Sequence, residues 1–219
     1  MEIPKEAFQE IYDELKRKPL DQNQYRLKAG SGISQSFGIV NKRSMPCDYS
    51  RQCWLRPKLF KLLQEFGDQW VPKEVPWTSV TVNQNYKAEK HRDRNNKGNS
   101  FLVGFGDYTK GNLLIHEGDL SGAHNIQYRP LITDFSKVLH SVEDFDGERF
   151  SLVYYTFAKK GIVPTLPPCS VKEENGQYFF YRGDQKITKK NGLPHHLRGR
   201  SKKSSIEASQ DSSFEVRFE

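Results

Sequence analysis

Two histidines and one aspartate stand at a spacing that could hold a metal ion. His91 and Asp93 are separated by one residue, His140 lies well downstream, and Arg149 and Ser151 follow it. Two imidazoles and one carboxylate are typical of a mononuclear iron(II) site with open coordination positions. The arginine beyond the second histidine could hold a keto-acid bound at those positions. The pattern therefore predicts oxidation chemistry at iron.

Backbone geometry explains how such distant residues could meet. Side chains i and i+2 of an extended segment face the same way, so His91 and Asp93 would point together and Arg92 away. We expect an apolar strand over 137–140 to end at His140 and return it to that point. His116 and His124 could replace His140 on residue type alone, but neither is followed by an arginine entering a β pattern.

The same alternation groups side chains of the next strand. It places Arg149, Ser151, Val153 and Tyr155 on one face, where the guanidinium and the hydroxyl could bind one carboxylate together. A zinc hydrolase remains open for the same ligand set, but it would leave Arg149 and Ser151 without a role.

Helical patterns dominate the first part of the chain. Apolar residues recur at helical spacing over 5–18, where Pro19 stops the pattern. A second helix is expected over 56–67, with Pro57 early and Gly67 at its end. Between them the sequence is rich in loops, with a short strand over 36–40.

From residue 77 onward the pattern changes to short strands. They are expected over 79–84, 100–105, 112–116, 125–128, 131–133, 137–140 and 150–156. Turn residues separate most of them, at 97–99, 110–111, 144–147 and 160–161. This series predicts an antiparallel sandwich or barrel, to which 177–182 adds an edge strand.

Length and composition predict one domain with a tail. The chain has 219 residues, 35% of them hydrophobic, enough for one core. The expected domain is 1–182, with a helical and loop-rich support over 1–76 and a β core over about 77–160. No apolar stretch could span a bilayer, and the N-terminus lacks a signal-peptide pattern, which predicts a cytoplasmic or nuclear protein without membrane contact. Three unpaired cysteines predict no disulfide-linked partner.

Positive charge is concentrated near the C-terminus. The net charge is +7, and 182–203 holds eight Lys or Arg residues against one acidic residue. We expect 183–219 to be a basic, then Ser-rich, mobile tail. The stretch 182–203 could contact DNA or RNA, could act as a localisation signal, or could be only a solvated tail.

The motifs around the expected site resemble those of the iron(II)/2-oxoglutarate-dependent dioxygenase superfamily, in particular its TET/JBP-type branch, which oxidises nucleobases. The likeness covers about residues 79 to 157. It rests on the segments 82–86 (VNQNY), 91–96 (HRDRNN), 98–100 (GNS), 106–113 (GDYTKGNL) and 147–153 (GERFSLV). Two features depart from the branch: a Gly-Gly pair is replaced at 110–112, and a cysteine-rich zinc module is missing.

The resemblance implies a mainly β, α+β fold with a jelly-roll core, the double-stranded β-helix, and N-terminal supporting helices. It implies that His91, Asp93 and His140 bind Fe²⁺ and that Arg149, with Ser151, binds 2-oxoglutarate. Dioxygen would be consumed, with ascorbate as a reductant.

By the same resemblance Asn83 and Tyr86 would line the co-substrate pocket. The expected reaction is hydroxylation or oxidation of a C–H bond, such as a methyl group on a modified base in DNA. Asn95 and Asn96 could contact the substrate or a metal ligand, although asparagines also form turns.

Two alternatives remain open. A protein or peptide hydroxylase, for example of the prolyl type, would use the same iron site. A non-catalytic nucleic-acid-binding jelly roll would not need His91, Asp93 and His140 to converge.

Overall fold

The computed structural model describes residues 1–21, 30–41 and 46–188. The predicted tail lies outside the described residues from 189 onward, but its expected start at 183 is wrong, because Gln185–Ile187 form a strand and Ile187 belongs to the main core. A 3-10 helix, η1 (Lys5–Phe8), leads into α1 (Gln9–Arg17), and a short α2 (Arg51–Leu55) precedes the longer α3 (Pro57–Trp70). None of the helices in the described ranges is long and apolar enough to cross a membrane.

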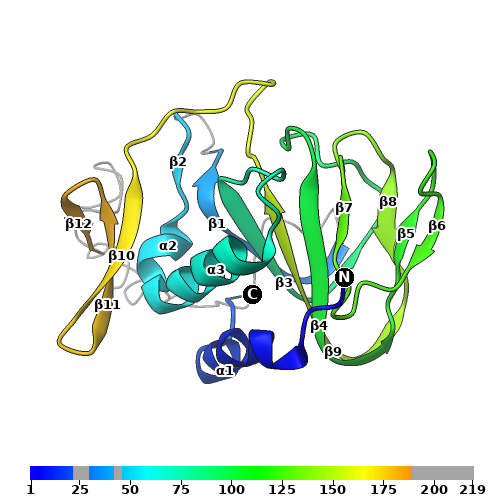
Figure 1. The fold of residues 1–219 in the computed structure, drawn as a ribbon, viewed down its shortest axis with the longest axis horizontal. Helices are drawn as coiled ribbons and strands as arrows, with labels where there is room; N and C mark the ends of the chain where they lie inside the picture. Colours follow the sequence, from blue (N-terminus) through cyan, green and yellow to red (C-terminus); the bar gives the residue numbers. More distant parts are fainter. Residues whose placement is uncertain (22–29, 42–45, 189–219) are drawn as a thin grey trace, which may run out of the picture.

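The strands in the described residues form three antiparallel sheets (Figure 1). The largest sheet has six strands in the order β2 (Asp48–Tyr49), β1 (Gly30–Val40), β3 (Ser79–Ala88), β9 (Phe145–Tyr155), β4 (Ser100–Lys110) and β7 (Leu131–Thr133). A second sheet has the order β6 (Gly122–His124), β5 (Leu113–Ile115) and β8 (His140–Val142). A third, well separated from the second in Figure 1, has the order β10 (Cys169–Glu174), β11 (Gln177–Arg182) and β12 (Gln185–Ile187).

Alternation along the central strands gives the large sheet two distinct faces. On β9, Phe150, Leu152 and Tyr154 belong to the core beneath the helices, whereas Arg149 and Ser151 line a cavity on the other face. That second face packs against β5 through a smaller apolar cluster. The predicted mainly β core with N-terminal supporting helices is confirmed, in a jelly-roll arrangement.

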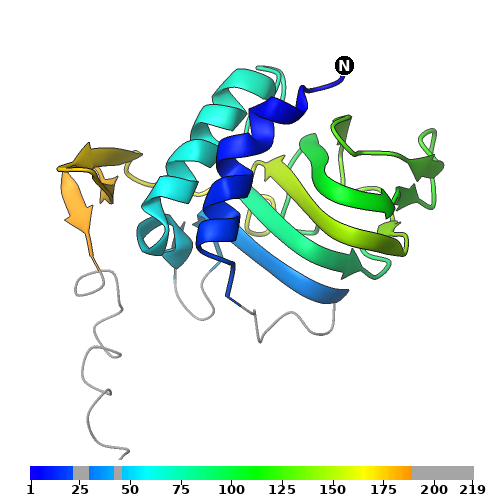
Figure 2. The ribbon, with the colours of Figure 1, turned by 90° about the horizontal axis from the view of Figure 1, so that it is seen from below.

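Helices α1 and α3 lie side by side over the outer face of the large sheet (Figure 2). The sequence predicts that the second helix ends at Gly67, but α3 continues to Trp70. A Cβ atom at Gly67 would lie 2.6 Å from the Trp77 ring and 2.8 Å from the Tyr154 ring. The glycine therefore marks a close approach between helix and sheet, not a helix end.

Several strand predictions need correction. The expected strand 125–128 is a loop with one bridge, between Gln127 and Gly104, and Tyr128 there has a φ of +58°. The expected turn 144–147 lies largely inside β9. A Cβ atom at Gly147 would lie 2.3 Å from the carbonyl oxygen of Asp107, so this glycine permits a close strand contact within the ladder.

Other corrections concern where strands belong. His140 begins β8 and does not end a strand, because β8 pairs with β5 from His140 onward. Strand β1, which we had assigned to the supporting segment, lies within the large sheet beside β3. Strand β11 matches 177–182 but is the central strand of the third sheet, not an edge. Of the cysteines, Cys53 is buried, and Cys47 and Cys169 are partly exposed; all three are free.

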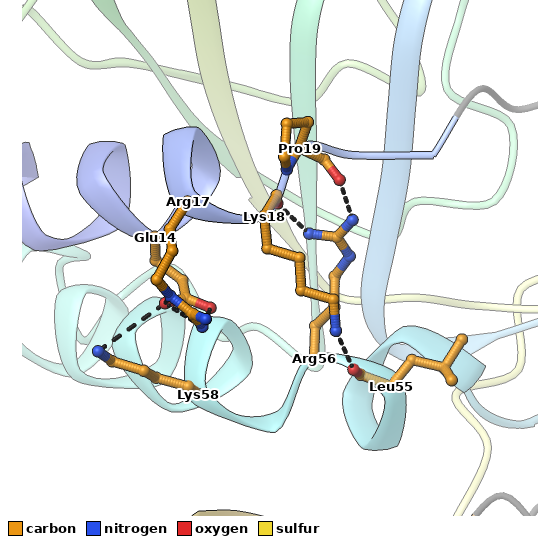
Figure 3. A network of polar contacts seen from close by, with 7 residues as sticks. All are labelled: Glu14, Arg17, Lys18, Pro19, Leu55, Arg56 and Lys58. Carbon is orange, nitrogen blue, oxygen red and sulfur yellow. Dashed lines mark hydrogen bonds and ion pairs between the residues drawn. The ribbon is translucent and has the colours of Figure 1, made fainter.

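A polar network joins the end of α1 to the start of α3 (Figure 3). The buried Arg56 guanidinium donates to the carbonyl oxygens of Lys18 and Pro19. Nearby, the buried carboxylate of Glu14 pairs with Arg17 at 2.6 Å and with Lys58 at 3.8 Å. These contacts fix the two helices relative to each other and therefore brace the sheet beneath them.

We expect Arg56→Met to lower the free energy of unfolding by about 2 kcal/mol, since hydrogen bonds from a charged group contribute roughly 1.5–3 kcal/mol. Urea denaturation measures the change. Arg51→Met is the matched control, because Arg51 is exposed, and it should stay within about 0.5 kcal/mol of the unchanged protein. Equal losses in both variants would contradict the bracing role of Arg56.

Candidate metal centre

His91, Asp93 and His140 converge as the sequence predicted. One ligand atom from each lies within 4.8 Å of the others. Direct backbone pairing brings them together: His91 N donates to His140 O at 2.9 Å, and His140 N donates to His91 O at 3.0 Å. Asp93 N donates to the carbonyl oxygen of Phe135 at 2.9 Å, which holds the third residue of the set in place.

Both imidazoles are oriented by backbone carbonyls. Nδ1 of His140 lies 3.0 Å from Val138 O, and Nδ1 of His91 lies 2.7 Å from Glu89 O. A carbonyl only accepts, so Nδ1 carries the proton in each ring and the lone pair is on Nε2. His91 Nε2 lies 3.4 Å from Asp93 Oδ1, on the side where the ligand atoms gather. A fixed second nitrogen of this kind is typical of metal-binding histidines.

Burial further favours metal binding by His140. This side chain is only 6% exposed, and burial lowers the pKa of its imidazole below the ordinary value. The neutral imidazole is the form that binds a metal ion. Asp93 supplies the carboxylate, so two neutral nitrogens and one anionic oxygen fit a divalent cation such as iron(II).

Arg92 braces the loop that carries His91 and Asp93. Its side chain leaves the ligand cluster, as predicted, and forms a bidentate pair with Glu117. Arg92 Nε also donates to Lys137 O at 3.0 Å. Glu117 in turn accepts from the backbone N of Leu139 at 2.6 Å, which is the main cause of its lowered pKa. This pair ties the loop to the segment that leads into His140.

Asn96 contacts a ligand directly. Its Nδ2 donates to Asp93 Oδ2 at 3.1 Å, and Ser100 Oγ lies 3.4 Å from the same nitrogen. Of the two roles considered for this residue, the structure places it beside a candidate metal ligand, Asp93. The neighbouring Asn95 lines the cavity, and its carbonyl oxygen accepts from Ala158 N at 2.7 Å.

We expect Asn96→Ala to weaken iron(II) binding about tenfold, because residues that orient metal ligands typically contribute a factor of 10–100 in affinity. Anaerobic titration with iron(II) measures the change. Asn99→Ala is the control, since Asn99 is an exposed asparagine of the same loop. Equal affinity in the two variants would remove Asn96 from the set of positioning residues.

Arg149 is a buried cation beside this centre. Its side chain is 2% exposed and lines the same cavity as the three candidate ligands. Nε donates to Gly111 O at 3.2 Å, and the guanidinium carbon lies 5.5 Å from the Tyr108 ring and 5.7 Å from the Phe145 ring. No carboxylate in the described part of the chain forms an ion pair with it. Burial lowers the pKa of Arg149, but arginine stays charged at any physiological pH.

An uncommon backbone position helps to orient Arg149. Asn85 has a φ of +48°, in the left-handed region that asparagine tolerates. Its Oδ1 accepts from Arg149 N at 2.8 Å, at the point where the ladder between β3 and β9 ends. Sequence reasoning missed Asn85, Tyr108 and Phe145; of these, only Phe145 lies near Arg149 in the sequence, where an aromatic residue beside an arginine was a usable signal.

The remaining predicted site residues also face the cavity. Asn83 Nδ2 donates to Ser151 Oγ at 3.1 Å, across the pairing of β3 with β9. Both line the cavity, together with Tyr86 and Tyr155. By contrast, Tyr154 belongs to the core on the other face of the sheet, where its hydroxyl donates to Leu63 O.

The cavity measures about 600 Å³, within the range of small-molecule sites. Apolar side chains that the sequence reasoning did not assign complete its wall: Val40, Leu102, Leu113, Phe135, Val142 and Phe157. His116 and His124 do not line it. His116 Nε2 instead lies 2.9 Å from Ser141 Oγ, and His124 Nε2 lies 2.6 Å from Leu120 O.

Comparisons with known proteins give distant likenesses. No family model matches the chain. No curated protein matches it either. Among solved structures, NgTET1 in complex with 5mC DNA is 17% identical with a TM-score of 0.48, covering 74% of this chain and 70% of that one.

Two bacterial structures are similarly distant. An oxidoreductase of the 2OG-Fe(II) oxygenase family from Burkholderia pseudomallei is 17% identical, with a TM-score of 0.47 and coverage of 69% and 78%. A prolyl-4-hydroxylase from Pseudomonas putida is 15% identical, with a TM-score of 0.44 and coverage of 72% and 88%. Likenesses at this level do not assign an activity, which has to come from the geometry of the site.

Proposed function

We propose that this protein is an iron(II)- and 2-oxoglutarate-dependent dioxygenase, with a catalytic domain that extends through β12. One observation carries the proposal: three metal-binding side chains and an unpaired, buried arginine line the same cavity. A cation held in the interior without a carboxylate is costly unless an anion reaches it. A keto-acid with a second carboxylate supplies that anion.

Each residue has a distinct role in binding. His91, Asp93 and His140 would hold iron(II), a metal that with three protein ligands can also bind a keto-acid and dioxygen. Arg149 and Ser151 bind the far carboxylate of 2-oxoglutarate, while Asn83 orients the Ser151 hydroxyl through their hydrogen bond.

Tyr86 lines the cavity together with Asn83. When bound, iron with 2-oxoglutarate and dioxygen supplies oxidative decarboxylation to succinate and carbon dioxide, coupled to hydroxylation of a substrate C–H bond. Ascorbate would keep the iron reduced.

The proposed substrate is the methyl group of a modified base in DNA. The sequence resemblance to the TET/JBP-type branch favours it, with Asn95 at the cavity wall as a candidate contact to the base. A zinc hydrolase is disfavoured because Arg149 would have no partner in it. A purely nucleic-acid-binding protein is disfavoured because it would not require three metal ligands to converge.

Succinate formation tests this proposal. The protein is loaded anaerobically with iron(II) and 2-oxoglutarate, oxygen is admitted, and succinate is compared with methylated DNA, methylated RNA and proline-containing peptides. We expect the largest increase with methylated DNA. Stimulation by peptides alone would replace the proposed substrate, and no succinate from iron-loaded protein under any condition would overturn the proposed activity.

A further inference from the structure

The loop after the metal ligands pairs with the segment after β9 at the edge of the cavity. Asn96 forms an antiparallel bridge with Phe157, and Ala158 N donates to Asn95 O at 2.7 Å. Asn95, Asn96 and Phe157 all line the cavity. A short two-stranded segment is therefore continuous with the wall of the candidate site.

Four exposed cations gather on this segment: Arg94, Lys97, Lys159 and Lys160. We call them the cationic ribbon. The bridge between Asn96 and Phe157 brings the segment that carries Arg94 and Lys97 beside the segment that carries Lys159 and Lys160. Like charges held on neighbouring segments repel each other.

Some exposed cations elsewhere are paired with carboxylates, although others, such as Lys5 and Lys73, have no ion pair within the described residues. Lys87 pairs with Asp144, and Lys110 pairs with Asp146. Within residues 1–21, 30–41 and 46–188, no carboxylate forms an ion pair with any member of the ribbon. The charge of the ribbon is therefore left for an external anion.

A tight hairpin, which begins at Lys159, lies next to the bridge between Asn96 and Phe157 and exposes an apolar side chain. Lys159 and Ile162 exchange both backbone hydrogen bonds, at 2.9 and 3.1 Å. Lys160 and Gly161 between them have φ values of +51° and +79°, as in the type I′ turns that join two strands rigidly. Ile162 is 72% exposed, so a large apolar group projects from a fixed backbone beside two lysines.

We propose that the cationic ribbon docks the phosphate backbone of duplex DNA and that Ile162 packs against the base stack where the target base leaves it. This inference rests on the proposed function, since a base inside a duplex cannot enter an interior cavity without turning out of the stack. Lysine and arginine side chains neutralise phosphates, and an apolar side chain beside them commonly acts as a wedge between bases.

The surface suits a duplex better than an acidic peptide. An extended peptide would need a groove or an open strand edge, with pockets for alternate side chains. Here four exposed cations and one exposed isoleucine lie on the same paired segments. A base stack offers an apolar surface between two lines of phosphates, which matches that arrangement.

Binding of a labelled duplex by the full chain tests the ribbon, using fluorescence anisotropy at several salt concentrations. Each phosphate contact that is lost should reduce the slope of log affinity against log salt by about 1. We expect Arg94→Gln with Lys159→Gln to reduce the slope by about 2. The control, Lys5→Gln with Lys73→Gln, removes the same charge from exposed sites in η1 and after α3 and should leave the slope unchanged.

The same variants measured with polyglutamate and with single-stranded DNA decide the partner. Ribbon-dependent binding of polyglutamate as tight as that of the duplex would overturn the assignment to nucleic acid, and equally tight binding of single strands would overturn the assignment to a duplex. Equal slopes in the ribbon and control variants would overturn the docking surface. Anisotropy requires neither iron nor 2-oxoglutarate, so this result is independent of whether the proposed chemistry occurs.

Ile162→Ala tests the wedge separately. A duplex with 2-aminopurine at the target position becomes brighter when that base leaves the stack. At saturating protein we expect the fluorescence increase with the variant to be several-fold smaller than with the unchanged protein. The slope of log affinity against log salt should be the same for both. An undiminished increase would overturn the role of Ile162. The side chain is exposed and its hairpin is held by backbone bonds, so the substitution should not affect folding.

Discussion

Replacing Asp93 or His140 by alanine is expected to abolish iron(II) binding and succinate formation. Each substitution removes one of three ligands whose donor atoms lie within 4.8 Å of one another. Loss of a residue that only orients a ligand already costs up to about 100-fold in affinity or activity, so loss of a ligand should exceed that factor. Anaerobic iron(II) titration and the visible absorption of the iron complex with 2-oxoglutarate measure both binding steps.

His116→Ala is the matched control for His140→Ala. His116 directly follows β5, and its Nε2 lies 2.9 Å from the hydroxyl oxygen of Ser141. It does not line the cavity. We expect this variant to bind iron(II) as the unchanged protein does. If His116→Ala lost iron while His140→Ala kept it, the ligand set would be wrong. Circular dichroism of the metal-free variants separates loss of a ligand from loss of the fold.

The sequence predicted this centre because its geometry follows from local rules. A side chain two residues from another in an extended segment shares its face, which placed His91 with Asp93 and Arg149 with Ser151. The return of His140 was predicted from its position in a β pattern. The register was not: His140 begins β8, because pairing with β5 and with His91 is decided by contacts across the sheet.

Features that depend on distant partners could not be predicted. Summed over the chain outside 182–203 the charge is zero, and such a sum does not show where cations gather in space. The structure brings the segment with Arg94 and Lys97 beside the segment with Lys159 and Lys160, through a pairing that spans some sixty residues of sequence. Likewise, the sequence predicts a turn over 144–147, whereas Phe145 belongs to β9 and packs against Arg149.

Arg149→Met should separate co-substrate binding from stability. Truncating one partner of a buried charge pair costs about 2 kcal/mol or more, so the KM for 2-oxoglutarate should rise at least about thirtyfold. Ser151→Ala removes one hydrogen bond to the charged carboxylate, worth about 1.5 kcal/mol, and should raise the KM for 2-oxoglutarate only about tenfold. Steady-state succinate formation at varied 2-oxoglutarate measures both changes.

Arg149→Met should weaken 2-oxoglutarate binding without lowering the free energy of unfolding. Arg56 donates to two carbonyl oxygens, whereas Arg149 has one acceptor at 3.2 Å and two aromatic rings. Methionine fills a similar volume without a buried charge, so Arg149→Met should leave the free energy of unfolding unchanged or raise it by up to about 2 kcal/mol. A loss as large as that of Arg56→Met would instead make Arg149 a structural residue.

A shortened co-substrate shows which group Arg149 recognises. 2-Oxobutyrate keeps the keto-acid end that binds iron but lacks the far carboxylate. The unchanged protein should strongly prefer 2-oxoglutarate, and Arg149→Met should lose nearly all of that preference by weakening 2-oxoglutarate alone. An equal loss with both keto-acids would mean that Arg149 acts on the shape of the cavity, because only 2-oxoglutarate carries the carboxylate that a buried, unpaired guanidinium would bind.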